Sequence, residues 1–191
     1  MSIQERRERE RAERGRLIVT TARELAEAEG WDAVTTRRLA EEIEYSQPVL
    51  YSHFKGKDAI MAAVAVEGCA ELAAELHTVR TSANDPQQAI AAVGAAYAAF
   101  AEQRPALYDV MFTHIVDLPF ATPQAPPALQ EAFAELRETV RPFAGADDNL
   151  EILVETFWSG LHGLLALMRS GRLRPEDHDR RLAALIRRFS T

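Results

Sequence analysis

Apolar residues recur three and four positions apart along most of this chain, from Leu17 to Phe189. That spacing is the period of an amphipathic α-helix, whereas a half-buried strand would alternate apolar and polar residues. Valine, isoleucine, threonine and tyrosine never form an alternating run of strand length, and alanine, the best helix former, is abundant. We therefore predict an all-α fold.

Prolines, glycines and capping residues divide the periodic stretches into about nine expected helices. We place them at about residues 11–29, 37–43, 47–53, 57–80, 86–103, 105–115, 127–143, 150–169 and from 175 to the end of the pattern. The residues before the first helix, 4–14, are dense in arginine and glutamate. They fit either a solvated helical extension held by ion pairs between residues four apart, or an arm that reaches nucleic acid.

The charge of the chain is unevenly distributed. Residues 1–57 hold 11 basic and 11 acidic side chains, so the whole net charge of −7 comes from residues 58–191. The composition alone therefore does not indicate a binder of nucleic acid. The single cysteine, Cys69, excludes an internal disulfide and a metal site built from cysteines alone, and it fits a reducing compartment. We expect it to be a small buried hydrophobic residue.

No segment has the features of a targeting or membrane-spanning sequence. Met1 to Arg16 is charge-dense and lacks the apolar core of a signal peptide. The longest uncharged runs free of clustered proline, Pro86–Ala101 and Thr156–Met168, are shorter than the roughly 18 residues that span a bilayer. We therefore expect a soluble cytoplasmic protein that does not contact a membrane.

Motifs of catalysis are absent from the sequence. The chain has no HExxH motif, no GxSxG nucleophile elbow, no P-loop and no GxGxxG turn. Its five histidines are scattered through different predicted helices. We predict no enzymatic activity, no bound metal and no cofactor, with a helical enzyme or binding bundle as a remote alternative.

The stretch from Val34 to Lys57 has the pattern of a helix-turn-helix, since two short predicted helices are joined by three or four residues. Such a unit needs small and polar groups at the start of its second helix, where they meet base edges in the major groove. Hydroxyls, lysines and helix N-termini around them hold phosphates. This mixture is supplied by Ser46, Gln47, Pro48, Val49, Tyr51, Ser52, His53, Lys55 and Lys57. The small core of the unit is expected from Leu39, Ala40, Ile43, Leu50 and Phe54.

Several motifs within residues 10–65 agree with one known family. They are Glu29-Gly30-Trp31, Thr35-Thr36-Arg37, Gln47-Pro48-Val49-Leu50-Tyr51-x-His53-Phe54 and Lys57-Asp58. With these motifs the chain resembles the tetracycline-repressor (TetR) family of bacterial regulators. The resemblance implies a three-helix helix-turn-helix DNA-binding domain at residues 1–57 and a roughly six-helix ligand-binding and dimerisation domain at residues 58–191. Trp158, His162 and Gly163 further resemble a Trp-His-Gly signature of one C-terminal subgroup, although they also fit core packing.

The resemblance implies a role for each polar residue of the helix-turn-helix. Arg37 and Gln47 are the expected readers of base edges, and Pro48 and Val49 offer apolar contact to a thymine methyl group. The remaining members of the DNA-binding set, of which all but Ser52 are expected to position phosphates, are Thr35, Thr36, Ser46, Tyr51, Ser52, His53, Lys55 and Lys57.

One position departs from the family pattern. Members usually carry glycine in the turn between the two short helices, where this chain has Glu44 followed by Tyr45. If the turn requires a positive φ angle, Glu44 takes up backbone strain.

The resemblance implies a homodimeric, sequence-specific repressor that a small ligand releases from double-stranded operator DNA. A regulator without ligand control, or an activator, is the alternative. The apolar seam expected to serve the dimer, part of which must fill the core of each subunit, is Leu150, Val154, Phe157, Leu161, Leu164 and Met168, with Leu182, Leu185, Ile186 and Phe189 from the last helix.

In the resembled family the ligand lies among the middle helices of the C-terminal domain. In this chain the implied apolar lining is Tyr97, Phe100, Leu107, Tyr108, Met111, Phe112, Phe133 and Phe157, with Arg104, His114 and His162 as polar candidates. Such a lining favours a mostly apolar ligand held by one or two hydrogen bonds. The alternative is that these side chains simply pack against one another.

Overall fold

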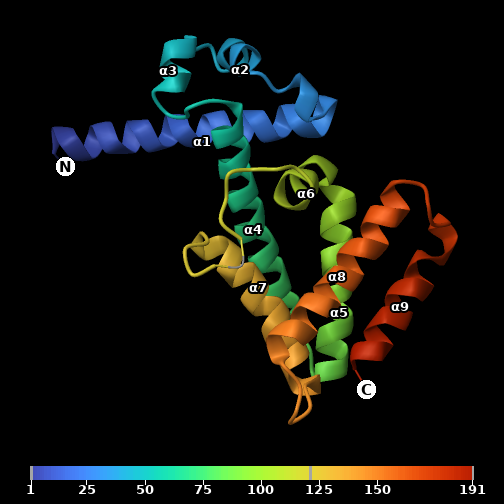
Figure 1. Cartoon of the computed structure of the whole chain (residues 1–191). Helices are drawn as coiled ribbons and strands as arrows, with labels where there is room; N and C mark the ends of the chain where they lie inside the picture. Colours follow the sequence, from blue (N-terminus) through green and yellow to red (C-terminus); the bar gives the residue numbers. More distant parts are fainter. Residues whose placement is uncertain (1, 121, 191) are drawn as a thin grey trace. The chain divides into compact units, whose positions relative to one another are not determined.

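The computed structural model describes residues 2–120 and 122–190, and within these residues it contains nine α-helices, three short 3₁₀ turns and no β-strand (Figure 1). The helices are α1 (Ile3–Glu29), α2 (Thr36–Glu42), α3 (Gln47–Tyr51), α4 (Lys57–Thr81), α5 (Pro86–Gln103), α6 (Pro105–Phe112), α7 (Pro127–Val140), α8 (Leu150–Arg169) and α9 (His178–Phe189). The all-α prediction is confirmed.

Two compact units divide the chain. The first comprises Met1–Gly68 and Arg104–Pro126, and the second comprises Cys69–Gln103 and Pro127–Thr191. Helix α4 begins in the first unit and ends in the second. The short helix α6 belongs to the first unit, although it follows α5 of the second unit along the chain.

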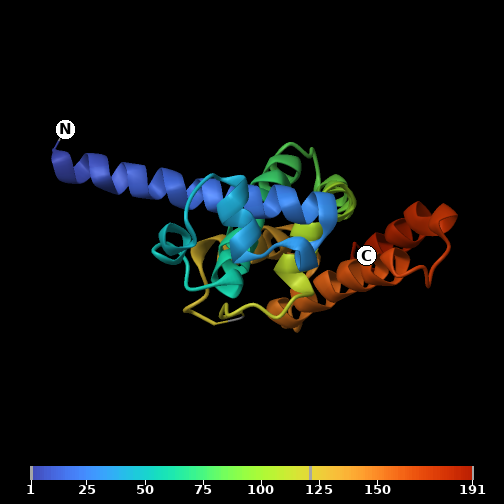
Figure 2. The ribbon, with the colours of Figure 1, turned by 90° about the horizontal axis from the view of Figure 1, so that it is seen from above.

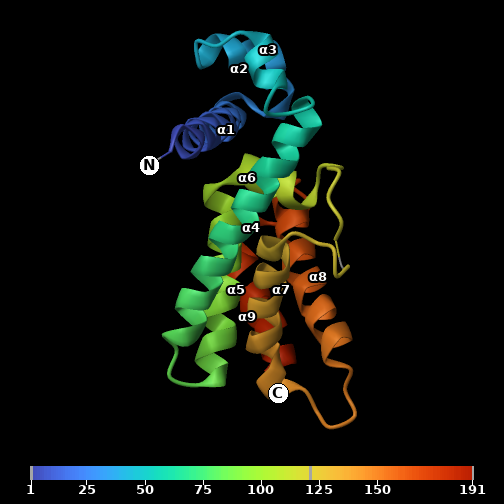
Figure 3. The same ribbon diagram turned by 90° about the vertical axis from the view of Figure 1, so that its left-hand side faces the viewer.

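The first unit is built on α1. Helices α2 and α3 lie along it (Figures 1 and 3), and the core between these helices and the start of α4 is apolar and fully buried. Its residues with no exposed surface include Ile18 and Ala22 of α1, Leu39 of α2, Leu50 of α3 and Ile60 of α4. Of the five residues expected to form the helix-turn-helix core, Leu39, Ala40 and Leu50 are buried, whereas Ile43 and Phe54 are half-buried.

The C-terminal end of α1 also holds α6 in the first unit. The carboxylate of Glu27 accepts hydrogen bonds from the backbone N–H groups of Ala106 and Leu107, at 3.1 and 2.9 Å. These N–H groups are in the first turn of α6, where a helix has no partners of its own for them. The indole Nε1 of Trp31 donates to the carbonyl of Ala106 at 2.8 Å. A side chain from another helix thus caps α6, whose own N-cap residue Arg104 makes no capping bond.

The second unit is a bundle in which α5, α7, α8 and α9 surround an apolar core (Figure 3). Tyr97 of α5 is fully buried, and its hydroxyl accepts a hydrogen bond from the indole Nε1 of Trp158 at 2.8 Å. Close approach of α9 depends on two glycines, because a Cβ atom on Gly94 or Gly160 would come within 3.0 Å of Ile186 or Leu185. The expected burial of Cys69 is confirmed, and this burial raises the pKa of its thiol to about 12.

Part of the predicted seam fills this core. Val154, Phe157 and Leu161 are buried in the unit itself, whereas Leu150, Leu164 and Met168 keep part of their surface exposed. The four apolar residues expected on the last helix, Leu182, Leu185, Ile186 and Phe189, are also half-buried.

Most helix boundaries agree with the sequence prediction, and the differences have local causes. Helix α1 begins at Ile3 rather than near residue 11, because Ser2 and Glu5 form a reciprocal capping box at its start. The expected extension over residues 4–14 is therefore regular helix, and it includes the predicted type of ion pair between Arg6 and Glu10. Helix α7 ends at Val140, and residues 141–143 form a 3₁₀ turn because Pro142 lacks the N–H that would continue the helix.

Helices α3, α6 and α9 are also shorter than predicted. Helix α3 ends at Tyr51 instead of 53, and α6 ends at Phe112 instead of 115. Helix α9 begins at His178, after a 3₁₀ turn at Pro175–Asp177, instead of at 175. In each case the missing turn lies at a helix end, where the periodicity of the sequence does not distinguish an α-helix from a tighter turn.

Candidate DNA-binding site

Helices α2 and α3 form the predicted helix-turn-helix, joined by residues 43–46. The hydroxyl of Thr35 accepts from the N–H of Arg38 at 3.1 Å and caps α2. Ser46 is at the N-cap position of α3, but its side chain makes no capping bond. Pro48 lies in the first turn of α3, where its missing N–H removes no hydrogen bond.

The turn between the helices contains the strain that the sequence suggested. Glu44 has a φ angle of +57°, and it is the only non-glycine residue with positive φ in the described part of the chain. Its N–H donates to the carbonyl of Glu41, and the N–H of Tyr45 donates to the carbonyl of Ala40. This hydrogen-bond pattern is a Schellman motif, in which the residue at the position of Glu44 is ordinarily glycine because it lacks a Cβ atom.

The structure brings the predicted DNA-binding residues onto the start of α2, the short helix α3 and the segment after it. Thr35, Arg37, Ser46, Gln47, Pro48, Tyr51, Ser52 and Lys55 are exposed, whereas Thr36, Val49, His53 and Lys57 are half-buried. The hydroxyl oxygens of Thr36 and Tyr51 lie 3.4 Å apart and link the two helices. The polar face expected to meet DNA is therefore continuous across the two helices.

The two arginines of α2 are both paired with carboxylates. Arg37 donates from Nε to Glu41 at 2.9 Å, and this hydrogen bond raises the pKa of its guanidinium group. The Arg37 side chain is 79% exposed. Arg38 makes a bidentate contact with Glu29 of α1, at 2.6 and 2.7 Å, and these hydrogen bonds lower the pKa of Glu29. Arg38 therefore ties α2 to α1, whereas Arg37 is exposed on the surface and pairs with Glu41 of its own helix.

Lys57 has a contact that its sequence context did not predict. Its ammonium group donates to the carbonyl of Trp31 at 2.5 Å and ties the start of α4 to the turn after α1. One of its donors is thus used inside the protein, and its role at a phosphate stays a prediction.

Four residues outside the predicted DNA-binding set lie beside α3, and three of them belong to the stretch 4–14 that fitted either a solvated extension or an arm that reaches nucleic acid. Arg7, Arg11 and Arg14 of α1, together with Tyr45 of the turn, line an open hollow of about 550 Å³ with Val49, Ser52 and His53. Arg11 donates from Nη2 to the carbonyl of Ser52 at 2.7 Å. Burial, together with the positive charges of Arg11 and Arg14, lowers the pKa of His53. The signal in the sequence was the spacing of the three arginines, which are four and three residues apart.

The predicted ligand lining is divided between the two units. Tyr97, Phe100, Phe133, Phe157 and His162 belong to the second unit, and Arg104, Leu107, Tyr108, Met111, Phe112 and His114 belong to the first. Within each unit several of these rings pack on neighbours: Phe157 on Phe189 with ring centres 5.2 Å apart, and Tyr108 on Phe112 at 5.0 Å. The exposed His114 lies near the Trp31 ring. The lining stays a prediction.

Two further properties of the described residues bear on function. They contain no group of three or more histidine, cysteine, aspartate or glutamate side chains placed to hold a metal ion. Among these same residues one helix, α8, is long and apolar enough to cross a membrane. The sequence prediction counted only uncharged runs and so did not mark this helix. Length and composition alone are weak evidence for a membrane span.

Both the N-terminal and the C-terminal part of the chain match models of known protein families. Residues 18–64 match the family model of bacterial regulatory proteins of the tetR family, and residues 90–189 match the model of the tetracyclin repressor-like C-terminal domain. The chain belongs to the TetR family. It is a DNA-binding transcriptional regulator with an N-terminal helix-turn-helix.

Individual relatives agree with this assignment. The chain is 48% identical to the class C tetracycline repressor of Escherichia coli over 48 residues, which cover 25% of this chain and 22% of the repressor. It is 25% identical to the HTH-type transcriptional regulator Rv0681 of Mycobacterium tuberculosis, over 91% of this chain and 78% of that protein. The match to the tetracycline repressor thus spans about a fifth of its length.

Solved structures share the fold. A protein of unknown function from Rhodococcus sp. RHA1 superposes with a TM-score of 0.76 at 23% identity, covering 92% of this chain and 93% of that one. RolR in complex with resorcinol superposes with a TM-score of 0.67 at 18% identity, covering 94% and 89%.

The strained turn gives a testable prediction. Replacing Glu44 with glycine relieves the positive φ, so we expect the E44G variant to be more stable by up to about 1 kcal/mol. Valine at the same position should cost more than about 1 kcal/mol, since a β-branched residue tolerates this conformation poorly. Urea unfolding monitored by circular dichroism measures both.

The matched control is Glu24→Gly, an exposed position within α1, where glycine should lower stability by about 1 kcal/mol. If E44G were destabilised as much as E24G, the turn would not be under strain.

Proposed function

We propose that this regulator is a homodimeric repressor whose first unit reads operator DNA through α2 and α3. In this proposal residues 1–57 are the DNA-binding domain and residues 58–191 the dimerisation and ligand-binding domain. The observation that carries the proposal is the exposed polar face of α2 and α3, where Arg37, Gln47 and Tyr51 project from buried supports. The cytoplasm, where the DNA is accessible, is the corresponding location.

The individual roles follow from chemistry and exposure. Gln47 is exposed in the first turn of α3, and an amide there can make two hydrogen bonds to an adenine edge. Arg37 is exposed near the start of α2 and suits a guanine edge. Lys55 is exposed just after α3, and its ammonium group suits a phosphate.

These roles predict different effects on DNA binding. Gln47→Ala and Arg37→Ala should each remove about 1–3 kcal/mol of discrimination at one base position. Lys55→Ala should weaken binding to all sequences alike and lower the slope of log affinity against log salt by about one unit. Fluorescence anisotropy on the full-length protein, with a duplex that it has selected from a random library and single-base variants of that duplex, measures these effects. A change of base preference in Lys55→Ala, without one in Gln47→Ala, would contradict the assignment.

The dimer interface is proposed on α8. Ile152 and Leu167 are 60% and 43% exposed, and they lie on one side of the helix because 15 residues make about 4.2 turns, which leaves them about 60° apart around its axis. Gly163 lies on the same face, and a Cβ atom placed on it would meet nothing within 4 Å. This face, with small residues between two exposed apolar ones, allows close approach of a second α8.

A charge on this face should separate the subunits. We expect the double variant I152E/L167E to sediment as a folded monomer at micromolar concentration, while the unaltered protein is a dimer. Ala91→Glu, an exposed position on α5, is the control that should leave the dimer intact. An unaltered protein that sediments as a monomer would refute the proposal.

Release by a small ligand completes the proposal. Its support is the aromatic composition of the predicted lining and the shared fold with RolR, whose structure contains the small aromatic resorcinol. A ligand that favours the conformation unable to bind DNA by about 1–3 kcal/mol would lower operator affinity about 5–150-fold.

The ligand test compares operator binding with and without a panel of small aromatic compounds, resorcinol among them. We expect at least one compound to release DNA from the unaltered protein, and Ala96→Trp, a space-filling change on α5, to reduce the response. An equal response in both proteins would contradict the predicted lining. If no compound in the panel acts, the regulator without ligand control becomes the favoured alternative.

A further inference from the structure

Three arginines of α1 form a row beside the helix-turn-helix. Arg7, Arg11 and Arg14 are four and three residues apart, so they share one face of the helix. Ile18, four residues after Arg14, is on the same face and is fully buried. The arginine row therefore continues the buried face of α1 outward, along a part of the helix that extends past α3 (Figures 1 and 2).

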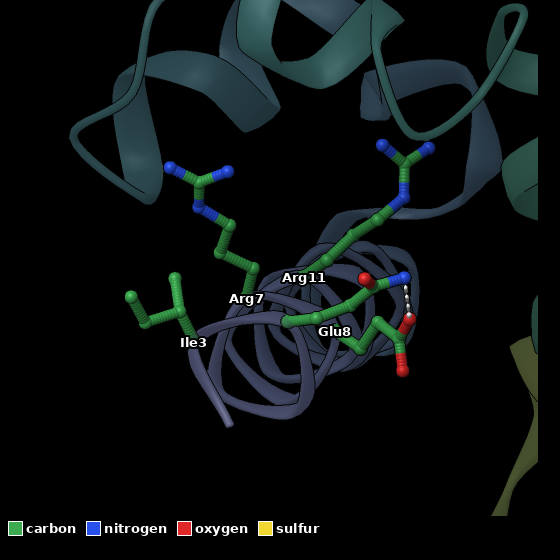
Figure 4. A pocket seen from close by; sticks show the side chains of 5 residues that line it. Ile3, Arg7, Glu8 and Arg11 are labelled. Carbon is green, nitrogen blue, oxygen red and sulfur yellow. Dashed lines mark hydrogen bonds between the residues drawn. The ribbon is translucent and has the colours of Figure 1, made fainter.

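The row lines two adjoining hollows. Arg7, Arg11 and Arg14 face α3 across the hollow of about 550 Å³ that Val49, Ser52 and His53 complete. Arg7 and Arg11 also line a second hollow, of about 480 Å³, with Ile3, Gln4 and Glu8 (Figure 4). Figure 4 shows the Arg7 and Arg11 side chains directed to the same side of α1, while the Glu8 carboxylate bonds to Gln4 away from them.

The carboxylates next to the row bond to other partners in the described part of the chain. Glu8 accepts a hydrogen bond from Gln4, and Glu10 pairs with Arg6 on another side of the helix. No aspartate or glutamate is among the residues that line the larger hollow. Burial, together with the charges of Arg11 and Arg14, lowers the pKa of His53, which lines the same hollow. In contrast, both arginines of α2 are paired with carboxylates.

We propose that this arginine row holds the sugar–phosphate backbone of the operator at the edge of the major groove that α3 reads. The inference rests on the proposed function and adds a second, sequence-independent contact to it. Guanidinium groups match phosphate geometry, and seven residues of helix cover about 10 Å. One strand of DNA presents about three phosphates over that length of its axis.

The position of the hollow beside α3 favours duplex DNA as the molecule that the arginine row binds. Val49 and Ser52 line the hollow from one side of α3, while Gln47 and Pro48 of the same short helix are exposed. A DNA strand that flanks the groove occupied by α3 therefore passes the arginine row. The bond from Arg11 to the Ser52 carbonyl fixes the row to α3 before DNA arrives.

The test compares two triple variants of the full-length protein that remove the same charge from the same helix. R7Q/R11Q/R14Q removes the row, and R6Q/R9Q/R16Q removes three arginines from the other faces of α1. Affinity for a duplex selected by the unaltered protein is measured between about 50 and 200 mM salt. We expect the row variant to lower the salt slope by about 0.9 for each phosphate that a DNA-binding unit no longer neutralises, with unchanged base preference. The control variant should change the slope much less.

Each outcome decides the proposal. Equal slopes in the two variants, or a changed base preference in the row variant, would overturn the arginine contact and leave the proposed function intact. If the unaltered protein selects no duplex, the proposed function fails and the inference fails with it. If circular dichroism shows that the row variant does not fold, R7Q/R14Q decides, because it keeps the bond from Arg11 to Ser52.

Discussion

The first unit depends on α1 more than on any other element, because the middle and the C-terminal end of this helix both hold other helices. In its middle, Ile18 and Ala22 are fully buried in the core of the unit. At its C-terminal end, Glu29 holds Arg38 of α2 and Glu27 caps α6. A helix shift that moved this end by one turn would break both contacts together. The two carboxylates therefore hold α2 and α6 on the same helix, α1. The position of α3 follows from that of α2.

Helix α3, which we propose reads the operator, depends on its neighbours for stability. Helix α3 has five residues, too few to be stable alone, and it is held by Leu50 beneath it and by the hydrogen-bonded turn before it. Because it is so short, most of its side chains face outward and are available to DNA. The strain at Glu44 is tolerated because the core contacts on either side over-determine the turn. A short helix on a rigid support thus provides base readers that need little rearrangement before binding.

The sequence predicted the features that local chemistry determines. The two short helices of the helix-turn-helix, and the strain expected at Glu44 if the turn takes a positive φ, depend on residues close together in the chain. The sequence could not predict contacts between distant segments. In the sequence Glu27 resembles any other helical glutamate, because the N–H groups of α6 that it binds are 79 residues further along the chain. The bond of Lys57 to the carbonyl of Trp31 likewise joins distant segments and could not be predicted, and the role of Lys57 at a phosphate stays a prediction. The row of Arg7, Arg11 and Arg14 was visible as a spacing, but its meaning depends on the hollow beside α3.

In the proposed complex, α3 lies in the major groove of each of two half-sites, with phosphate contacts on both sides of it. Chemical interference with the selected duplex tests this claim directly, since methylated guanine N7 blocks the major groove and ethylated phosphates block the backbone. We expect two clusters of interfering guanines with centres about 34–36 Å apart, each flanked by interfering phosphates. A single cluster, or interference by phosphates without any interfering guanine, would contradict the proposed complex.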